Sequence, residues 1–340
     1  MSASGIAVWA PVLMGGLLAS TARADVVIET ASVGNPGNAG EVSGWGAGGY
    51  GPDRVCGAVD YVYSIGKYEA TAGQYTAFLN AVAVTDTYGL YNTGMWNSES
   101  GCQIERTGWP GNYSYSVAPD WADRPVNYVS WGDAARFCNW LHNGQPTGPQ
   151  GLGTTENGSY FLDGAIWTVE LMDVVREPDA TWVIPSEDEW YKAAYHKNDG
   201  VTGNYWDYPT SSDSVPSNEL IDPDPGNNAN FWEGDWTIGP PYRRTEVGAF
   251  GNSSSPYGTF DQGGNVWEWN EAVMGSVQRS RGIRAGSWAY YASDMRASNR
   301  HYHRNPTTEG GGIGFRVSLI PEPASILMLA LASVGIMRRR

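Results

Sequence analysis

The stretch Asp261-Gln262-Gly263-Gly264-Asn265-Val266-Trp267-Glu268-Trp269 joins a glycine-rich turn to two tryptophans with a carboxylate between them. The whole chain has this character: its 340 residues include 44 glycines and 16 tryptophans, and charged residues make up only 17% against a usual share of about 25%. Such an aromatic load excludes disorder and indicates a compact, loop-rich globule with a core built largely from aromatic side chains. Long amphipathic helices are not expected to dominate it.

The charge balance of the chain is acidic. Asp and Glu number 36 against 21 Lys and Arg, which gives a net charge of −15. Phosphate backbones repel a protein of this charge, so we expect no nucleic-acid partner. No G-x-S-x-G turn is present, and the glycine-rich segment 44–51 lacks the lysine of a phosphate-binding loop. We interpret that segment as part of a flexible N-terminal lead.

Capping residues and apolar spacing predict three short helices. Thr71 can cap a run that continues to Val82, Ser130 can cap a run that ends before Asn143, and Ser186 forms a capping box with Glu189. β-Branched and aromatic residues bounded by Gly or Pro predict strands at 61–68, 181–184, 281–288 and 314–319. Long loops are expected at 85–121, 144–180 and 200–230, where function often lies.

Both ends of the chain look like targeting segments. Residues 1–24 contain an apolar run and end in Ala22-Arg23-Ala24, the small-x-small pattern of a signal-peptidase site, so Asp25 is the expected mature start. Residues 321–340 comprise Pro-Glu-Pro, a short apolar stretch and three arginines, too short for an ordinary membrane span. This tail resembles the PEP-CTERM sorting signal, which implies an exosortase-type processing machinery as partner. An ordinary buried helix at the first end and a tail anchor or merely hydrophobic terminus at the second are the alternatives.

Six ordered motifs carry a resemblance to a known family. They are Ile65-Gly66-Lys67-Tyr68-Glu69, Pro125-Val126-Asn127-Tyr128-Val129-Ser130-Trp131, Ile184-Pro185-Ser186-Glu187-Asp188-Glu189-Trp190, Gly264-Asn265-Val266-Trp267-Glu268-Trp269, Arg284-Ala285-Gly286-Ser287-Trp288 and Gly314-Phe315-Arg316-Val317. In this order they resemble the formylglycine-generating enzyme (sulfatase-modifying factor) family. The resemblance implies one irregular α+β domain, C-type-lectin-like, with few short helices and strands and long loops. The implied organisation is a signal peptide at 1–24, an N-terminal lead at 25–60, the domain at 61–320 and the sorting segment at 321–340.

The same resemblance bears on copper. Enzymatic members of the family hold copper with two cysteines placed shortly after the Gly-Ser-aromatic segment. The matching window here is 289–296, and it contains no cysteine. Tyrosine and methionine cannot replace a thiolate pair for Cu(I), so we expect no copper and no catalytic residues of the family's oxidase.

For calcium, the resemblance implies a structural site whose matching positions are Asp261, Gly264, Val266 and Glu268. Two carboxylates and two backbone carbonyls within eight residues suit a hard, oxygen-seeking cation. Without the resemblance, Glu268 would be interpreted as a loop-capping carboxylate. A second family site would begin at Asn230 and Phe231, but no acidic partner follows in 238–242.

Other candidate side chains have simpler interpretations. The odd count of Cys56, Cys102 and Cys138 suggests one disulfide and one free thiol, with Cys138 a small buried hydrophobe on a helix face. His301, His303 and Glu309 could form a metal triad, although a solvated or salt-bridged pair of histidines suffices. The loop aromatics could stack on sugar rings or pack on the core: Tyr91, Trp96, Trp109, Tyr113 and Trp121.

These features together predict an exported protein of the cell surface or extracellular matrix. We expect it to act as a binding or scaffold module for an extracellular polysaccharide or a surface protein, without copper oxidase activity. One alternative is an oxidoreductase of the same superfamily with a different active site. Another is a purely structural component of the matrix.

Overall fold

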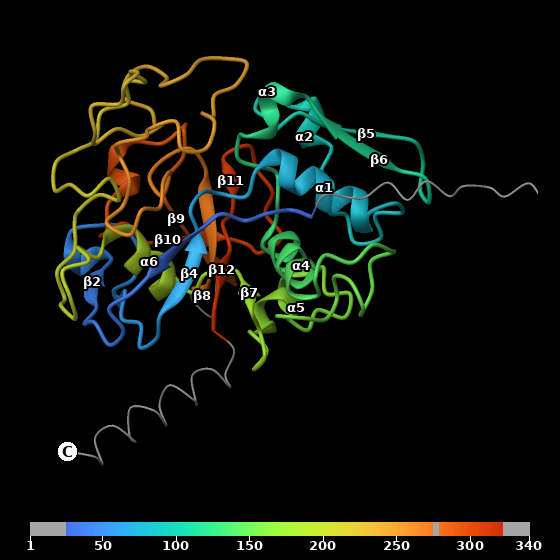
Figure 1. The fold of residues 1–340 in the computed structure, drawn as a ribbon, viewed down its shortest axis with the longest axis horizontal. Helices are drawn as coiled ribbons and strands as arrows, with labels where there is room; N and C mark the ends of the chain where they lie inside the picture. Colours follow the sequence, from blue (N-terminus) through green and yellow to red (C-terminus); the bar gives the residue numbers. More distant parts are fainter. Residues whose placement is uncertain (1–24, 275–278, 322–340) are drawn as a thin grey trace, which may run out of the picture.

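The computed structural model describes residues 25–274 and 279–321 (Figure 1). The predicted signal peptide and nearly all of the sorting segment lie outside these residues. Short helices and short strands separated by long loops make up the described chain, which confirms the predicted α+β class. No helix within the described residues is long and apolar enough to cross a bilayer.

The first sheet brings the beginning and the end of the domain together. Its order is β1-β4-β12-β7, and its neighbouring strands are antiparallel. Thr30 pairs with Gly66 on one side of β4, and Ser318 pairs with Ile65 on the other. Residues from the predicted N-terminal lead therefore form part of this sheet. The strands are β1 (Thr30–Val33), β4 (Tyr63–Gly66), β7 (Trp182–Val183) and β12 (Ser318–Leu319).

The second sheet is built around the strand that carries Trp267-Glu268-Trp269. Its order is β10-β9-β8-β11, with β8 antiparallel to β9 and parallel to β11. Trp267, Glu268 and Trp269 are all buried. The strands are β8 (Trp267–Met274), β9 (Ser280–Arg284), β10 (His301–Arg304) and β11 (Ile313–Gly314).

Two small ribbons complete the strands. β2 (Glu41–Ser43) pairs with β3 (Arg54–Cys56), and β5 (Ile104–Thr107) pairs with β6 (Ser114–Val117). The first ribbon flanks the glycine-rich segment 44–51, whose backbone is bonded to the body of the protein from Gly44 N to Ser298 O at 3.0 Å. Segment 44–51 therefore packs on the domain, contrary to the flexible lead expected for it. The second ribbon lies within the predicted loop 85–121.

The three predicted helices are confirmed, each with a capping box. In each, the N-cap hydroxyl of Thr71, Ser130 or Ser186 accepts a hydrogen bond from the backbone of the third helical residue, whose side chain caps in return. The helices are α1 (Ala72–Val82), α2 (Gly94–Asn97), α3 (Pro119–Ala122), α4 (Trp131–His142), α5 (Thr168–Asp173) and α6 (Glu187–Tyr195), with 3-10 turns η1 (Trp45–Ala47) and η2 (Ala292–Met295).

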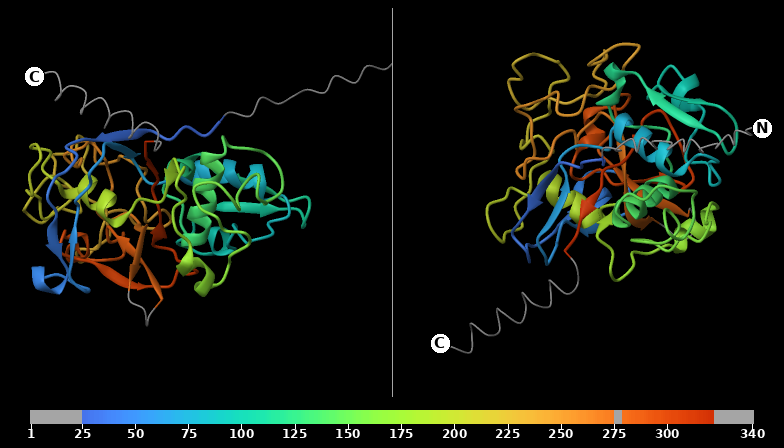
Figure 2. Two further views of the ribbon diagram at one scale, coloured as in Figure 1. Left: turned by 90° about the horizontal axis from the view of Figure 1, so that it is seen from below. Right: turned by 45° about the vertical axis from the view of Figure 1, so that its right-hand side comes forward.

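Aromatic packing forms the centre of the core, as the composition predicts. Rings of α1 and α4 meet there: Phe78 lies 5.3 Å from Phe137 and 5.2 Å from Trp140, measured between ring centroids. Phe315 packs edge-on against Phe137 at 5.3 Å. Figure 2 shows α1, α4 and the β5–β6 ribbon gathered on one side of the molecule, with β8, β9 and β10 on the other.

A buried ion cluster joins α6 to the second sheet. Glu187, at the start of α6, is 3% exposed and accepts hydrogen bonds from Arg284 at 2.8 Å and Arg300 at 2.7 Å. Arg54 of β3 adds a third ion pair at 3.2 Å. Burial alone would raise the pKa of Glu187, but these arginines lower it to about 2.

All four strand predictions are longer than the strands observed: 61–68 corresponds to the shorter β4 and 181–184 to the shorter β7, and the other two predictions differ most. The segment 281–288 leaves the sheet after Arg284, because Ala285 and Gly286 have positive φ angles of 96° and 71°. The segment 314–319 divides between β11 and β12, which belong to different sheets. Between them the carbonyls of Phe315 and Val317 accept backbone hydrogen bonds from the chain around β4.

The predicted disulfide is wrong. Cys56, Cys102 and Cys138 are all free and fully buried. Cys138 lies in the main hydrophobic core, as its helix position predicts, and Cys56 lies in a separate cluster with Trp190.

Candidate functional site

Arg316 is the centre of the site. It is fully buried and forms a two-point ion pair with Glu268: Nε lies 2.6 Å from Oε2, and Nη2 lies 2.6 Å from Oε1. Trp190 also donates its indole N–H to Glu268 Oε2 at 2.7 Å. Both oxygens of the Glu268 carboxylate are therefore engaged within the protein.

The remaining donors of Arg316 tie the surrounding chain together. Its Nη1 donates to the carbonyl of Gly66 at 2.9 Å, at the end of β4, and its Nη2 donates to the carbonyl of Phe260 at 2.9 Å. The guanidinium group thus connects β8 with the segments that lead into Glu69 and Asp261. Three acidic residues from distant parts of the sequence are brought to one buried region by these contacts.

Asp261 occupies a strained backbone position with φ of 58°. Its Oδ2 accepts a hydrogen bond from the backbone N–H of Gly248 at 2.6 Å. Burial raises the pKa of Asp261 to about 6, because this bond and the charge of Arg316 do not fully compensate for lost hydration.

Glu69 is the most unusual group in this region. Its side chain is 2% exposed, and neither carboxylate oxygen has a hydrogen-bond partner among the described residues. Burial raises the pKa of Glu69 well above its ordinary value, and the charges of Asp261 and Glu268 raise it further. A buried carboxylate without a partner is costly, so this position calls for an explanation.

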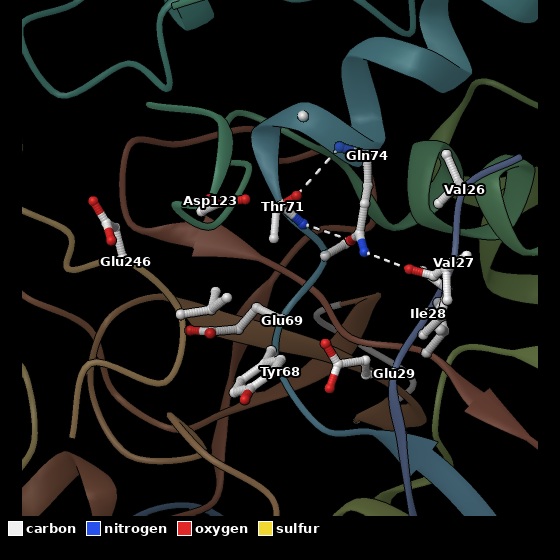
Figure 3. Close-up of a pocket in the computed structure, with 14 residues that line it drawn as sticks. Val26, Val27, Ile28, Glu29, Tyr68, Glu69, Thr71, Gln74, Asp123 and Glu246 are labelled. Carbon is white, nitrogen blue, oxygen red and sulfur yellow. Dashed lines mark hydrogen bonds between the residues drawn. The ribbon is translucent and has the colours of Figure 1, made fainter. Parts of the chain in front are cut away.

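An acidic cavity of about 590 Å³ lies beside this cluster. Figure 3 shows Glu69 in its wall, with Glu29 on one side and Glu246 and Asp123 on the other. Two of these acids have basic neighbours, since Glu29 lies 4.0 Å from Lys67 and Glu246 lies 3.6 Å from Arg124. The described residues that line the cavity include no Lys or Arg: Val26, Val27, Ile28, Glu29, Tyr68, Glu69, Ala70, Thr71, Gly73, Gln74, Asp123, Glu246, Val247 and Val317.

The segments implied for calcium do lie together. The backbone N–H of Asn265 donates to the carbonyl of Asn230 at 2.7 Å, so the two implied calcium segments are side by side. Gly264 has φ of 79° and approaches Asn230 so closely that a Cβ atom would lie 2.1 Å from its carbonyl oxygen. Val266 and Phe231 are fully buried.

The fit of these residues to calcium is partial. Within residues 25–274 and 279–321, no three His, Cys, Asp or Glu side chains converge as a metal-binding group. Of the two carboxylates implied for calcium, Glu268 forms an ion pair with Arg316. Asp261 does not form an ion pair with that arginine. The two Glu69 oxygens in the same region have no hydrogen-bond partner among the described residues, so they are further oxygen atoms that a cation could use.

The copper window 289–296 is filled by packing. Tyr290 lies edge-on to Trp267 with ring centroids 5.2 Å apart, and its hydroxyl accepts a hydrogen bond from Arg304 at 3.2 Å. Met295 is fully buried in a cluster with Tyr208 and Phe231.

The remaining sequence candidates are placed as follows. His301 packs against Trp267 at 4.9 Å, while Glu309 accepts a hydrogen bond from Asn92, and burial together with Asp133 raises the pKa of Glu309 to about 8. The side chain of His303 lies outside the described residues, so the predicted triad stays a prediction. Of the loop aromatics, Tyr91 and Trp121 are buried, Tyr113 is half-buried, and Trp96 and Trp109 are 43% and 66% exposed.

The sequence interpretation missed Glu69 and Arg316 as members of the site. Both residues stand inside quoted motifs, at the end of Ile65-Gly66-Lys67-Tyr68-Glu69 and within Gly314-Phe315-Arg316-Val317. For Arg316 a signal was available, because a charged residue within an apolar strand segment is rarely buried unless it is paired with an opposite charge. Glu69 offered no comparable signal, since its buried oxygens have no hydrogen-bond partner among the described residues.

The domain is irregular and α+β, and a buried ion pair joins its Trp-Glu-Trp strand to its Gly-Phe-Arg segment. These features place it in the formylglycine-generating class of folds. The chain is a member of the family of the sulfatase-modifying factor enzyme 1-like domain, which matches residues 56–319.

Several known proteins are similar to this chain. The inactive C-alpha-formylglycine-generating enzyme 2 of Bos taurus is 25% identical over 205 residues, which cover 56% of this chain and 49% of the bovine protein. The serine/threonine-protein kinase pkn1 of Chlamydia caviae is 31% identical over 157 residues, which cover 40% of this chain and 21% of that protein. The chain thus spans less than half the length of these relatives.

Among solved structures, Treponema denticola variable protein 1 superposes with a TM-score of 0.51 at 18% identity. The superposition covers 86% of this chain and 95% of that one. At this identity the likeness concerns the fold alone.

Proposed function

We propose that this protein is exported to the cell surface or extracellular matrix and uses the sulfatase-modifying-factor-like domain as a binding module. In this proposal the protein has no copper-dependent oxidase activity. The main observation in favour of this proposal is that residues of the window 289–296 pack into the protein: Tyr290 packs on Trp267, and Met295 is fully buried. Neither side chain offers a thiolate for Cu(I).

The comparisons support this proposal at the level of the family. The bovine relative is named as an inactive formylglycine-generating enzyme, so the fold also occurs in a protein described as lacking the activity. Buried Cys56, Cys102 and Cys138 lie at other places in the fold, and burial raises the pKa of each thiol. Thiols of this kind are poorly suited to bind metal or react.

Export and sorting are proposed from the two ends of the sequence. Processing by a signal peptidase at Ala24 and by an exosortase near Pro321-Glu322-Pro323 would remove four arginines and leave a more acidic mature chain. Intact-mass measurement of the secreted protein tests this. Retention of Arg338-Arg339-Arg340 in the mature form would contradict the sorting proposal.

The activity proposal is tested with a sulfatase-derived cysteine peptide, copper and oxygen. We expect no aldehyde above the level of the peptide and copper alone, while a catalytically competent family member forms aldehyde under the same conditions. A binding screen against extracellular polysaccharides and surface proteins follows. Aldehyde formation by the purified chain would instead favour an oxidoreductase with a different active site. Silence in the screen together with self-association would favour a structural matrix component.

A further inference from the structure

A groove lies between the glycine-rich segment 44–51 and residues 293–301. It consists of two cavities, of about 400 Å³ and about 290 Å³, which share Gly48, Arg296 and Ser298 as lining residues. Because they share these residues, the two cavities are adjacent parts of one elongated groove. Ligand-binding clefts typically have volumes of about 300–1,000 Å³, so the groove has room for a short, chain-like ligand.

Backbone contacts hold the two walls of this groove together. The N–H of Gly44 donates to the carbonyl of Ser298 at 3.0 Å, and the N–H of Arg300 donates to the carbonyl of Tyr50 at 2.7 Å. A Cβ atom at Gly49 would lie 1.9 Å from the Ser298 carbonyl oxygen, so this close approach requires glycine. The groove is therefore formed by the protein alone, and a preformed cleft loses less conformational entropy on binding than a mobile one.

The groove is lined by hydrogen-bonding groups of both kinds. Asp294 lines the larger cavity, and Glu41 and Asp207 line the smaller one. Arg296 lines both, and its Nε donates to the Tyr208 hydroxyl at 2.8 Å, which holds the guanidinium in place. Burial raises the pKa of Asp294 and of Glu41, because each carboxylate loses hydration there. A ligand hydroxyl that donates to such a carboxylate would replace part of that lost hydration.

An aromatic ring is available at the larger cavity. Tyr50 lines this cavity and is 38% exposed, and its ring centroid lies 5.7 Å from that of His301, which lines the same cavity. Trp45, in the turn η1 that ends just before Gly48, is 56% exposed. Aromatic rings supply a large apolar face at a low cost in conformational entropy, so Tyr50 offers a surface on which the C–H face of a sugar ring can stack.

The charges of the lining exclude other classes of ligand. Among the residues that line the two cavities, the carboxylates of Glu41, Asp207 and Asp294 stand against the single guanidinium of Arg296, so a polymer of phosphates or uronic acids would be repelled. An apolar ligand would bury these carboxylates without hydrogen bonds, which is costly. Uncharged sugars fit this lining, because each hydroxyl can donate to a carboxylate and accept from a guanidinium.

We propose that this groove binds a linear oligosaccharide of uncharged sugars. Hydroxyls of the sugar chain donate to Asp294 and Asp207 and accept from Arg296, and one sugar ring stacks on Tyr50. The inference rests on the proposed binding role and assigns a place and a chemical class to the polysaccharide in it. It also gives the glycine-rich segment 44–51 a function as one wall of the site.

Calorimetric titration of the full-length protein with unbranched hexasaccharides of glucose, N-acetylglucosamine, galactose and mannose tests the inference. We expect saturable binding of at least one of them. Gly48→Asn should weaken that binding by about tenfold or more, because it adds a side chain where both cavities meet and where Gly48 faces open space. Asparagine tolerates the left-handed conformation of Gly48, whose φ is 75°.

Two further variants separate the groove from other exposed aromatics. Tyr50→Ala should also weaken binding by about tenfold, because it removes the stacking surface. The matched control is Trp109→Ala, which removes a 66% exposed ring between β5 and β6 and should change the dissociation constant less than about twofold. Circular dichroism establishes that each variant is folded.

The proposal is overturned if the wild type binds none of the four hexasaccharides, or if folded Gly48→Asn and Tyr50→Ala bind as tightly as the wild type. Binding of oligogalacturonate as tight as that of the best uncharged hexasaccharide would overturn the assignment to uncharged sugars. Capture of a surface protein without any glycan binding would refute this inference and leave the proposed binding role standing. Aldehyde formation from the cysteine peptide would contradict the proposed lack of oxidase activity and would not alter the titrations of the groove.

Discussion

Glu187→Gln should destabilise the protein strongly at neutral pH and weakly in acid. The substitution keeps the shape of the side chain but removes the charge that Arg284, Arg300 and Arg54 share. Arg284 and Arg300 are themselves buried, so the change leaves guanidinium charges without their common partner. Breaking a buried pair in this way typically costs about 3–5 kcal/mol.

The pKa of Glu187 gives a second way to calculate how much stability the Glu187 carboxylate contributes. The three arginines lower that pKa from 4.5 to about 2, and each unit of difference corresponds to about 1.4 kcal/mol of stability. The carboxylate therefore contributes about 3 kcal/mol. Because the folded-state pKa is the lower one, this contribution is complete well above pH 4.5 and disappears as the pH falls towards 2. About 1 kcal/mol should remain at pH 3.

Urea denaturation followed by tryptophan fluorescence measures this directly at pH 7, 5 and 3. The free energy of unfolding of the variant should lie about 3 kcal/mol below that of the wild type at pH 7, and the gap should shrink at pH 3. Asp188→Asn is the matched control. Among the described residues the ion-pair partner of Asp188 is the part-exposed Arg54, and its Oδ1 also accepts a hydrogen bond from the backbone N–H of Gly57, so the loss should be smaller. A gap for Glu187→Gln that stays constant from pH 7 to pH 3 would refute the reasoning.

Three further predictions concern the fold. Thr71→Ala removes the N-cap hydroxyl of α1 and should lower the free energy of unfolding by about 1 kcal/mol, measured by urea denaturation. In a thermal melt, Gly264→Ala should destabilise the protein far more than the control Gly111→Ala. Both glycines have positive φ, but a Cβ at Gly264 would strike Asn230, whereas Gly111 faces open space. Equal losses of melting temperature would contradict this. A thiol assay without reductant should find all three cysteines in denatured protein, and Cys138 should be unreactive in native protein; a count of one would restore the disulfide.

Local rules predict the helices well because each helix start carries its own signal. The capping boxes at Thr71, Ser130 and Ser186 are contained within four residues, so no distant contact is needed to find them. The strands are harder, since a two-residue strand such as β12 exists only because β4 and β7 lie on either side of it. The β5–β6 ribbon is also difficult to predict. Its turn contains Pro110-Gly111, but the sequence analysis expects a long loop over 85–121 and therefore no strand pairing there.

The buried ion contacts could not be predicted in full because they depend on partners far apart in the sequence. Arg316 and Glu268 are separated by 48 residues, and Arg284 and Glu187 by 97. The sequence identifies these residues as charged members of apolar motifs, without indicating which charge meets which. For Glu268 this matters, because the family pattern suggests a metal ligand and the structure assigns its oxygens to an arginine.

The placement of β1 and β12 on either side of β4 gives the domain a useful geometry for engineering. Thr30 and Ser318 pair with adjacent residues of β4 from opposite edges, and neighbouring strands are about 4.8 Å apart. The two strands are therefore about 10 Å apart and run parallel to each other, so a linker from the end of β12 to the start of β1 must cross back along the sheet, which takes about a dozen residues. A circular permutant that joins the chain across this gap and opens it in an exposed loop, such as the one around Gly111, should keep the native pairing of β4. The same closeness would allow the domain to be inserted into a surface loop of another protein with little distortion of the host.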